Sequence, residues 1–587
     1  MGKPQGDGDD FSGIDPQHLW ELIGSIKSHA TVDGSRSAQA AVNDWRSKAN
    51  SIGLLTTELG KLDAHFAWAR DQIPMLTRRH SLAADQAKEE KDFGVSGMVP
   101  NGAASLGNYP TQAAAKKAAQ ADAKKYKDGK MSAKDYYAKL QENQFDPDYS
   151  LAAVNALGET KLFELEQETS YVNPDDPDQP RSALANTVAT AMRGGATFKD
   201  PAGHEDIALL SPLVPDAPFP KNVLLDLADQ SRAVGNFPYA DNVWKGLGHD
   251  PAASTEFLHD HPDLLGKSIT TSETSRGGIP SNQVASFATV IASGTQGSAG
   301  SDPNMAAANA TTLVKYFGNH PNSHTYGPIQ QVFAQDIDLY WNDMVPSVTD
   351  PAPVDDYGPG HVSVSADEWK GFIDESMRDP HSAAYLMALA NTRSDELANS
   401  DHHNPEIVHA STLLQGFFNQ QAVTVYQQMG ADKSANGKQW QTSVSTWLNS
   451  AELNAVNIVF DPSAVAVPLT KAVLTQTANF FTHDIVPAGN SGKTFIPKVE
   501  TWQGRWQSSA AMAYTDDSTV GDPKKYAALY SDGKPFLDEN GKLVPDASKG
   551  QQRAYNAWLQ DPATSKKAQP YFAEQDSGHF DGLEEGQ

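Results

Sequence analysis

Short segments that begin with Asp-Pro and continue with alanine, leucine and phenylalanine recur along this chain. After Asp250-Pro251, the residues Ala253, Phe257 and Leu258 would share one face of a helix. An aspartate can accept hydrogen bonds from the free N–H groups of a first helical turn, and proline has no N–H to lose there. The same pattern occurs in FDPDYSLAAVNAL from Phe145, SDPNMAAANATTL from Ser301 and RDPHSAAYLMAL from Arg378. These starts favour many short helices.

We therefore predict a mainly α-helical fold: an N-terminal helical hairpin or coiled coil, then an irregular multi-helix array with few short strands. The 587 residues allow about three or four domains. The expected parts are a WXG-like helical hairpin (1–90), a linker with a lysine- and alanine-rich helix (91–140), a main helical domain (141–490) and a C-terminal tail (491–587). The tail is expected to hold a small hairpin at Asn540-Gly541 and to be disordered over residues 576–587.

Apolar residues recur by threes and fours in two runs of the N-terminal part. The first run is Ala38, Val42, Trp45, Ala49 and Ile52. In the second run, we expect five residues to form a seam that pairs with a partner helix: Leu55, Leu59, Leu62, Phe66 and Ile73. The alternative is an ordinary amphipathic helix pair, in which this seam is only internal core. Pro74 is expected to kink or end the second helix.

The charge and composition exclude several classes of function. The net charge of −27 argues against a nucleic-acid partner. The absence of cysteine excludes disulfides, thiolate metal sites and cysteine nucleophiles. The most apolar region, residues 455–486, is interrupted by charges and prolines, so we expect a buried helix pair and no stable membrane insertion. The N-terminus is polar and acidic, unlike a signal peptide, which predicts secretion without one or a cytoplasmic location before export.

Three patterns resemble binding sites. Residues 489–494, GNSGKT, resemble the end of a phosphate loop, but Pro487 stands where a glycine is needed, so we expect no cofactor. His402, Glu406 and His409 would share a helix face as metal ligands, but Pro405 favours a helix start that leaves His402 in a loop. A metal site is therefore not expected. Five lysines crowd one helix, and we interpret them as a solvated face rather than a basic binding patch: Lys116, Lys117, Lys124, Lys125 and Lys127.

Three passages resemble a family of uncharacterised actinobacterial proteins with a WXG/ESX-like helical N-terminal region. They are LTTELGKLDAHFAWARDQIPMLTRRHSLA from Leu55, FDPDYSLAAVNALGETKLFEL from Phe145 and LGHDPAASTEFL from Leu247. Larger members of this family are secreted, polymorphic-toxin-like proteins with a variable effector domain behind this region. The resemblance spans roughly residues 11–490 and supplies no catalytic residues.

The resemblance implies a delivery, scaffold or interaction protein of an actinobacterial secretion or injection system. Its partner would be a component of that system or a helical chaperone. No catalytic motif is present, so we expect a non-enzymatic protein. Two alternatives stay open: a secreted effector or toxin with a C-terminal or metal-dependent activity, and a phage-like structural component.

Overall fold

The computed structural model describes most of the chain in fourteen stretches. They are residues 16–30, 37–52, 57–92, 106–172, 178–233, 239–271, 278–297, 301–349, 358–400, 405–432, 439–440, 442–444, 499–545 and 547–585. The chain divides into two compact units, with unit 1 formed by residues 1–257 and 297–302 and unit 2 by the rest. The expected four-part division stays a prediction.

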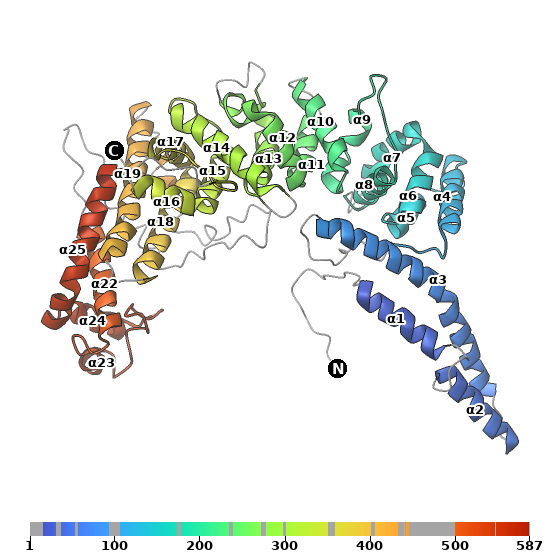
Figure 1. Cartoon of the computed structure of the whole chain (residues 1–587), viewed down its shortest axis with the longest axis horizontal. Helices are drawn as coiled ribbons and strands as arrows, with labels where there is room; N and C mark the ends of the chain where they lie inside the picture. Colours follow the sequence, from blue (N-terminus) through green and yellow to red (C-terminus); the bar gives the residue numbers. More distant parts are fainter. Residues whose placement is uncertain are drawn as a thin grey trace. The chain divides into compact units, whose positions relative to one another are not determined.

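Unit 1 is built from helices (Figure 1). Its helices are α1 (Pro16–His29), α2 (Ala38–Ser51), α3 (Thr57–Asp92), α4 (Gln112–Lys127), α5 (Ala133–Asn143), α6 (Pro147–Leu157), α7 (Glu159–Val172), α8 (Asp178–Arg193), α9 (Ile207–Leu210), the 3-10 helix η2 (Val214–Asp216), α10 (Lys221–Ala233), α11 (Ala240–Gly248) and most of α12 (Pro251–Asp260).

Unit 2 is also helical. It contains the 3-10 helices η3 (Pro262–Leu265), η4 (Lys267–Ile269) and η5 (Ser281–Gln283), followed by α13 (Val284–Thr295), α14 (Pro303–Asn319), α15 (Gly327–Leu339), α16 (Trp341–Thr349), α17 (Ala366–Met377), α18 (Pro380–Ser400), α19 (Pro405–Asp432), α22 (Val499–Asp516), α23 (Pro523–Tyr530), α24 (Lys549–Leu559) and α25 (Pro562–Glu585).

The mainly α-helical prediction is confirmed. Among the residues described there is no β-strand, only two isolated bridges between single residues. One bridge joins Leu537 to Leu543 around Gly541, whose φ of 73° suits a glycine in a tight turn, so the expected small hairpin turn is present.

The Asp-Pro starts behave as expected. The carboxylate of Asp146 accepts hydrogen bonds from the N–H groups of Asp148 and Tyr149 at the start of α6. Asp250 accepts one from Ala253 at 2.9 Å at the start of α12. Asp379 does the same for α18. These caps satisfy donors that have no partner within their helices.

Small side chains allow close packing in unit 1. Helix α6 contacts α4 on one side and α8 on the other. Helix α8 presents a run of buried small and aliphatic residues: Ala183, Leu184, Ala185, Val188, Ala189 and Ala191. Because alanine lets helix axes approach closely, these short helices can pack tightly against one another.

The core of unit 2 is aromatic. The rings of Phe317, Phe333 and Phe372 join α14, α15 and α17, with successive centroids 4.9 Å and 4.5 Å apart. Trp558 of α24 is buried and donates its indole N–H to the carbonyl of Val520 at 2.9 Å. The C-terminal helices therefore have a core of their own.

Pro74 lies inside α3, which continues to Asp92, so the helix does not end there and the alternative, a kink, stays a prediction. The expected disorder after residue 575 is wrong up to Glu585, because α25 continues to that residue and contacts α19. Gly578 of α25 approaches the carbonyl of His409 so closely that a side chain there would clash. At Gly578, α25 therefore lies directly against α19.

Candidate partner-binding surface

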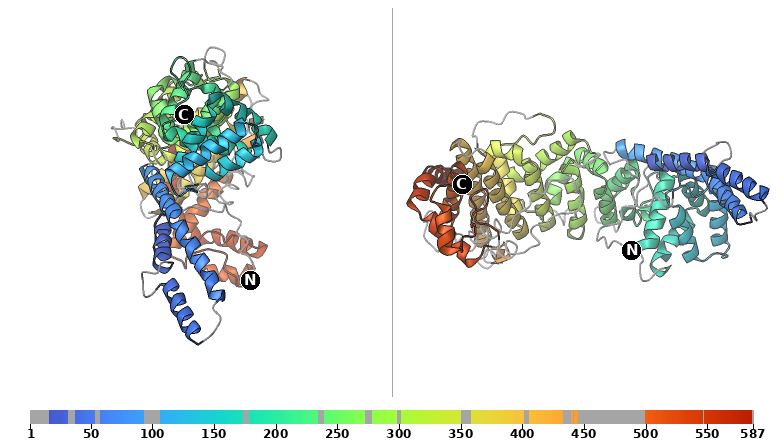
Figure 2. Two further views of the ribbon diagram at one scale, coloured as in Figure 1. Left: turned by 90° about the vertical axis from the view of Figure 1, so that its right-hand side faces the viewer. Right: turned by 90° about the horizontal axis from the view of Figure 1, so that it is seen from below.

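The first three helices form a hairpin, which we call the arm (α1–α3, residues 16–92). Helices α1 and α2 follow one another along one side of α3, and both contact it (Figures 1 and 2). The side chain of Ser37 starts α2 by accepting a hydrogen bond from the N–H of Ala40. Few apolar side chains of α1, α2 and the residue after α1 are buried: Leu19, Ile23, Ala30 and Val42. A single layer of helices covers only one side of each helix, so much of the arm is open.

Polar contacts join the two sides of the arm along one edge, which we call the polar edge. Arg46 of α2 lies 2.8 Å from Asp63 of α3. Arg70 of α3 donates to the carbonyl of Ala30 at 2.7 Å and also to the side chain of Gln39. The Arg46–Asp63 pair fixes the register, because it places these two residues at the same level of the arm.

The opposite edge carries exposed apolar side chains. Trp45 and Leu62 each precede a member of the Arg46–Asp63 pair by one residue, which is about 100° around the helix. Because α2 and α3 run antiparallel, moving back by one residue on each helix leads to the same side of the arm, away from the polar edge. Ile52 follows Trp45 by seven residues and lies on the same side of α2. We call Trp45, Ile52 and Leu62 the tip cluster.

All three side chains of the tip cluster are exposed. Trp45 is 63% exposed, Ile52 73% and Leu62 37%. Eleven large apolar side chains are exposed among the residues described, and six of them lie on the arm. Apolar surface gathered in this way marks interaction sites more often than scattered single residues do.

Trp20 differs from the tip cluster although it also lies on the arm. It is 53% exposed, but it packs against the ring of His80 with centroids 4.9 Å apart, and the ammonium of Lys27 lies 5.7 Å from its ring centre. It sits on the side of α1 away from Leu22, because two residues span about 200° of helix. Trp20 therefore already has partners within the arm.

The five predicted interface residues have different environments. Leu55 lies outside the described residues, and only the backbone of Leu59 is described. Leu62 is exposed, whereas Phe66 and Ile73 are half-buried. The predicted interface stays a prediction. Sequence reasoning did not single out Trp45 and Ile52 as interface residues, although their seven-residue spacing was visible in the first apolar run.

A buried joint connects the arm to the helices behind it. Arg78 of α3 donates to both carboxylate oxygens of Asp146 at 2.5 Å and 2.7 Å and to Asp148 at 2.9 Å. Arg79 donates to the carbonyl of Leu106 at 2.7 Å and to Asn108 at 2.6 Å. Two consecutive arginines of α3 therefore fix the arm to the start of α6 and to the segment before α4.

The three metal candidates are not brought together by described contacts. His402 lies outside the described residues, and Glu406 is described only by its backbone in α19. The Nε2 atom of His409 lies 2.6 Å from Asp581 of α25. Within the described stretches, no group of three or more histidine, aspartate and glutamate side chains is arranged to hold a metal ion.

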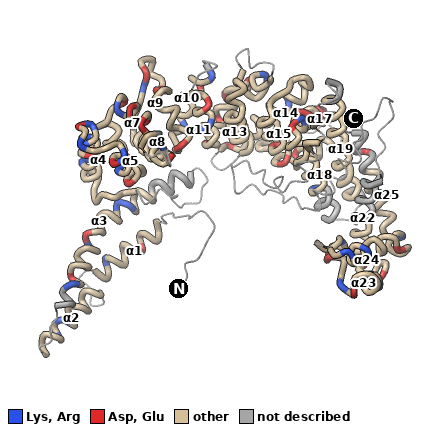
Figure 3. The backbone as a smooth tube through the Cα atoms, turned by 180° about the vertical axis from the view of Figure 1, so that it is seen from behind, with Lys and Arg blue, Asp and Glu red and all other residues tan. Residues whose placement is uncertain are grey.

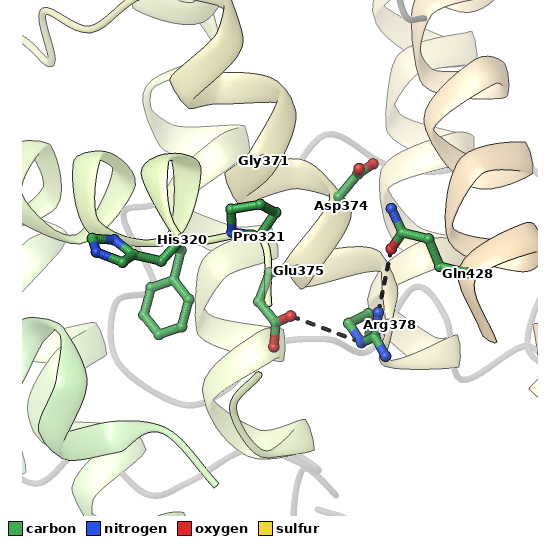
Figure 4. Close-up of a pocket in the computed structure, with 8 residues that line it drawn as sticks. His320, Pro321, Gly371, Asp374, Glu375, Arg378 and Gln428 are labelled. Atoms are coloured by element: carbon green, nitrogen blue, oxygen red, sulfur yellow. Dashed lines mark hydrogen bonds and ion pairs between the residues drawn. The ribbon is translucent and has the colours of Figure 1, made fainter. Parts of the chain in front are cut away.

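A small depression lies in unit 2 between α14, α17 and α19 (Figure 4). Burial raises the pKa of Asp374 to about 7, and its Oδ1 atom has no hydrogen-bond partner among the described residues. The neighbouring Glu375 accepts hydrogen bonds from the N–H of Thr325 at 2.7 Å and from Gln330 at 2.8 Å. The enclosed space has room for about one water molecule, so it suits a buried water rather than a substrate.

The lysines of α4 are interspersed with carboxylates, as Figure 3 shows around α4 and α5. Lys124 lies 3.1 Å from Asp128, and Lys116 lies 3.5 Å from Asp148. Lys127 donates to the carbonyl of Ala156 at 3.0 Å. These contacts favour a solvated face over a basic binding patch.

None of the described helices is both long and apolar enough to cross a bilayer. Comparisons with protein-family models, curated proteins and solved structures gave no significant match to this chain. The resemblance of the three sequence passages therefore stays an expectation.

Proposed function

We propose that this chain is a non-enzymatic delivery, scaffold or interaction protein, and that the arm is the part that binds other proteins. The observation that supports this proposal is the tip cluster, where Trp45 and Ile52 keep more than half of their surface exposed. Large aromatic and aliphatic side chains on a rigid helical support are the usual anchors of protein interfaces.

The joint supports the same function. An arm held by Arg78 and Arg79 keeps its direction relative to α4 and α6. A partner bound at the tip therefore meets an oriented surface, and little ordering of the arm is needed on binding. Together with the resemblance of its sequence, this suits a protein that presents or delivers itself to a secretion or injection system.

The test is co-purification of the tagged full-length chain from its native host, with culture medium and cytosol analysed separately by mass spectrometry. We expect a protein partner that is recovered with the wild type and lost with Trp45→Asp or Leu62→Asp. The matched control is Tyr171→Asp, because Tyr171 is 82% exposed on α7, outside the arm. Circular dichroism checks that each variant keeps its helices.

Two results would contradict the proposal. One is a partner that stays bound to both arm variants. The other is recovery of the wild type only as a free cytosolic monomer.

A further inference from the structure

Helix α17 is held differently on the two sides of the small depression in unit 2 (Figure 4). On one side it meets α14 backbone to backbone, because a Cβ on Gly371 would lie 2.7 Å from the carbonyl oxygen of Gly318. On the other side, Arg378 reaches the end of α19 through side chains, donating to Gln428 at 3.3 Å. At this place, α19 is therefore the neighbour that can move away from α17 with the smaller disturbance.

The carboxyl of Asp374 lies at this looser side. Figure 4 shows it directed from α17 toward Gln428 of α19. Its Oδ1 atom is shielded from solvent and accepts no hydrogen bond within the described part of the chain. A buried carboxylate that lacks a hydrogen bond is costly, whereas the neutral carboxyl costs much less. The depression therefore favours the protonated form of Asp374.

The titratable and polar groups around Asp374 do not offset this preference. Those that line the depression or act on the carboxyl are Lys370, Glu375 and Arg378 of α17, His320 after α14, and Gln428 of α19. The guanidinium of Arg378 is shared with Glu375, whose carboxylate lies 3.8 Å from its Nε atom. Burial raises the pKa of Asp374 to about 7, although Arg378, Gln428 and Lys370 each lower it.

This preference for a proton couples opening of the depression to pH. If water enters, the carboxyl regains the pKa of 3.8 that an exposed aspartate has. The closed form therefore keeps a proton that the open form releases between about pH 4 and 7. Below this range both forms are protonated, and opening is hardest. As the pH rises through it, opening becomes easier by up to about tenfold for each pH unit.

We propose that Asp374 and the depression form a proton-controlled latch between α17 and the end of α19. With a proton on Asp374, the end of α19 stays closed over α17. When the carboxyl ionises, water enters and this end of α19 separates from α17 more often. The latch belongs to unit 2 and does not depend on the function proposed for the arm.

The latch also affects the contact that follows α19. Trp440 donates its indole N–H to the carbonyl of Met377 at 3.0 Å, at the end of α17. Tyr426 of α19 packs against the ring of Trp440, with centroids 6.4 Å apart. Separation of the end of α19 therefore removes one support of the contact between Trp440 and α17.

Hydrogen exchange of the full-length chain, followed by mass spectrometry between about pH 5 and 7, tests the latch. Peptides covering residues 420–428 report the opening constant once the intrinsic exchange rate is divided out. We expect this constant to rise at least about tenfold in the wild type. Asp374→Asn has nearly the same shape and is always neutral, so its rise should be less than about twofold. Asp336→Asn is the matched control, because it removes another buried carboxyl of unit 2 and should keep the full rise.

Infrared difference spectra between about pH 5 and 8 give a second readout that does not depend on opening. The wild type should show the stretching band of a protonated carboxyl that disappears at the higher pH. Asp374→Asn should lose one component of this band, whereas Asp336→Asn should keep that component.

Three results would overturn the latch: an opening constant in the wild type that does not change with pH, an equal rise in the wild type and Asp374→Asn, and a rise that Asp336→Asn abolishes. If Asp374→Asn does not fold, the wild-type exchange still decides, because a rise of less than about twofold between pH 5 and 7 contradicts the proposal.

Discussion

Replacing Arg78 by methionine should weaken the joint between the arm and α6. The side chain of Asp146 is completely buried and that of Arg78 is 10% exposed, so their ion pair is shielded from water. Removing one partner of a buried pair leaves an uncompensated charge and costs about 3–5 kcal/mol. Asp146 keeps its hydrogen bonds to the N–H groups of Asp148 and Tyr149, so we expect the lower end, about 3 kcal/mol.

The matched control is Arg46→Met in the same arm. The Arg46–Asp63 pair is open to water, with side chains 26% and 43% exposed, so its loss should cost less than about 1 kcal/mol. The assay is native-state hydrogen exchange, read as the free energy of local opening of the first turn of α6. A local measurement is needed because a chain of two units does not unfold in one step.

A double variant tests the cause of the effect. Asparagine can also cap a helix, so Arg78→Met combined with Asp146→Asn removes both charges and keeps the cap. We expect this double variant to recover more than half of the lost stability. Equal losses for Arg78→Met and Arg46→Met, or no recovery in the double variant, would refute the role given to the buried charge.

Two further predictions concern unit 2. Burial raises the pKa of Asp336 to about 8 although Thr295 donates to it. The folded chain therefore holds a proton that the unfolded chain releases above about pH 4, so the stability of the fold decreases as the pH rises from about 4 to 8. Asp336→Asn should reduce this decrease by at least about 1 kcal/mol, measured by urea unfolding at several pH values. An unchanged dependence of stability on pH would contradict this prediction. A Cβ on Gly371 would lie 2.7 Å from the carbonyl oxygen of Gly318, so Gly371→Ala should destabilise unit 2 by about 1–3 kcal/mol in thermal unfolding. Gly24→Ala is the control, since nothing lies within 4 Å of that position, and it should stabilise α1 by up to about 1 kcal/mol.

The sequence predicts helix starts well, because each start depends on two adjacent residues. Asp146 and Asp250 cap their helices through their own side chains, and the proline that follows restricts the backbone locally. No distant residue is needed for this. The same locality explains why the turn at Gly541 was predictable.

Predictions that depend on tertiary contacts fail or stay incomplete. The sequence of α25 has proline and glycine inside it and a polar end, which suggests disorder. The helix is held instead by α19, against which Gly578 fits closely. Likewise, an apolar seam on α2 and α3 does not reveal which of its sides is covered. The packed arm shows it: Arg46 and Asp63 are in contact, and Trp45 and Leu62 are exposed.

The passages that carry the resemblance have a structural meaning that sequence spacing could not give. The passage from Leu55 supplies Arg78, and the passage from Phe145 supplies Asp146 and Asp148, so the two meet at the joint. Both passages therefore contribute to one buried contact. A contact of this kind fixes the direction of the arm relative to α6. In the function proposed above, the joint orients the arm and the exposed tip cluster meets the partner.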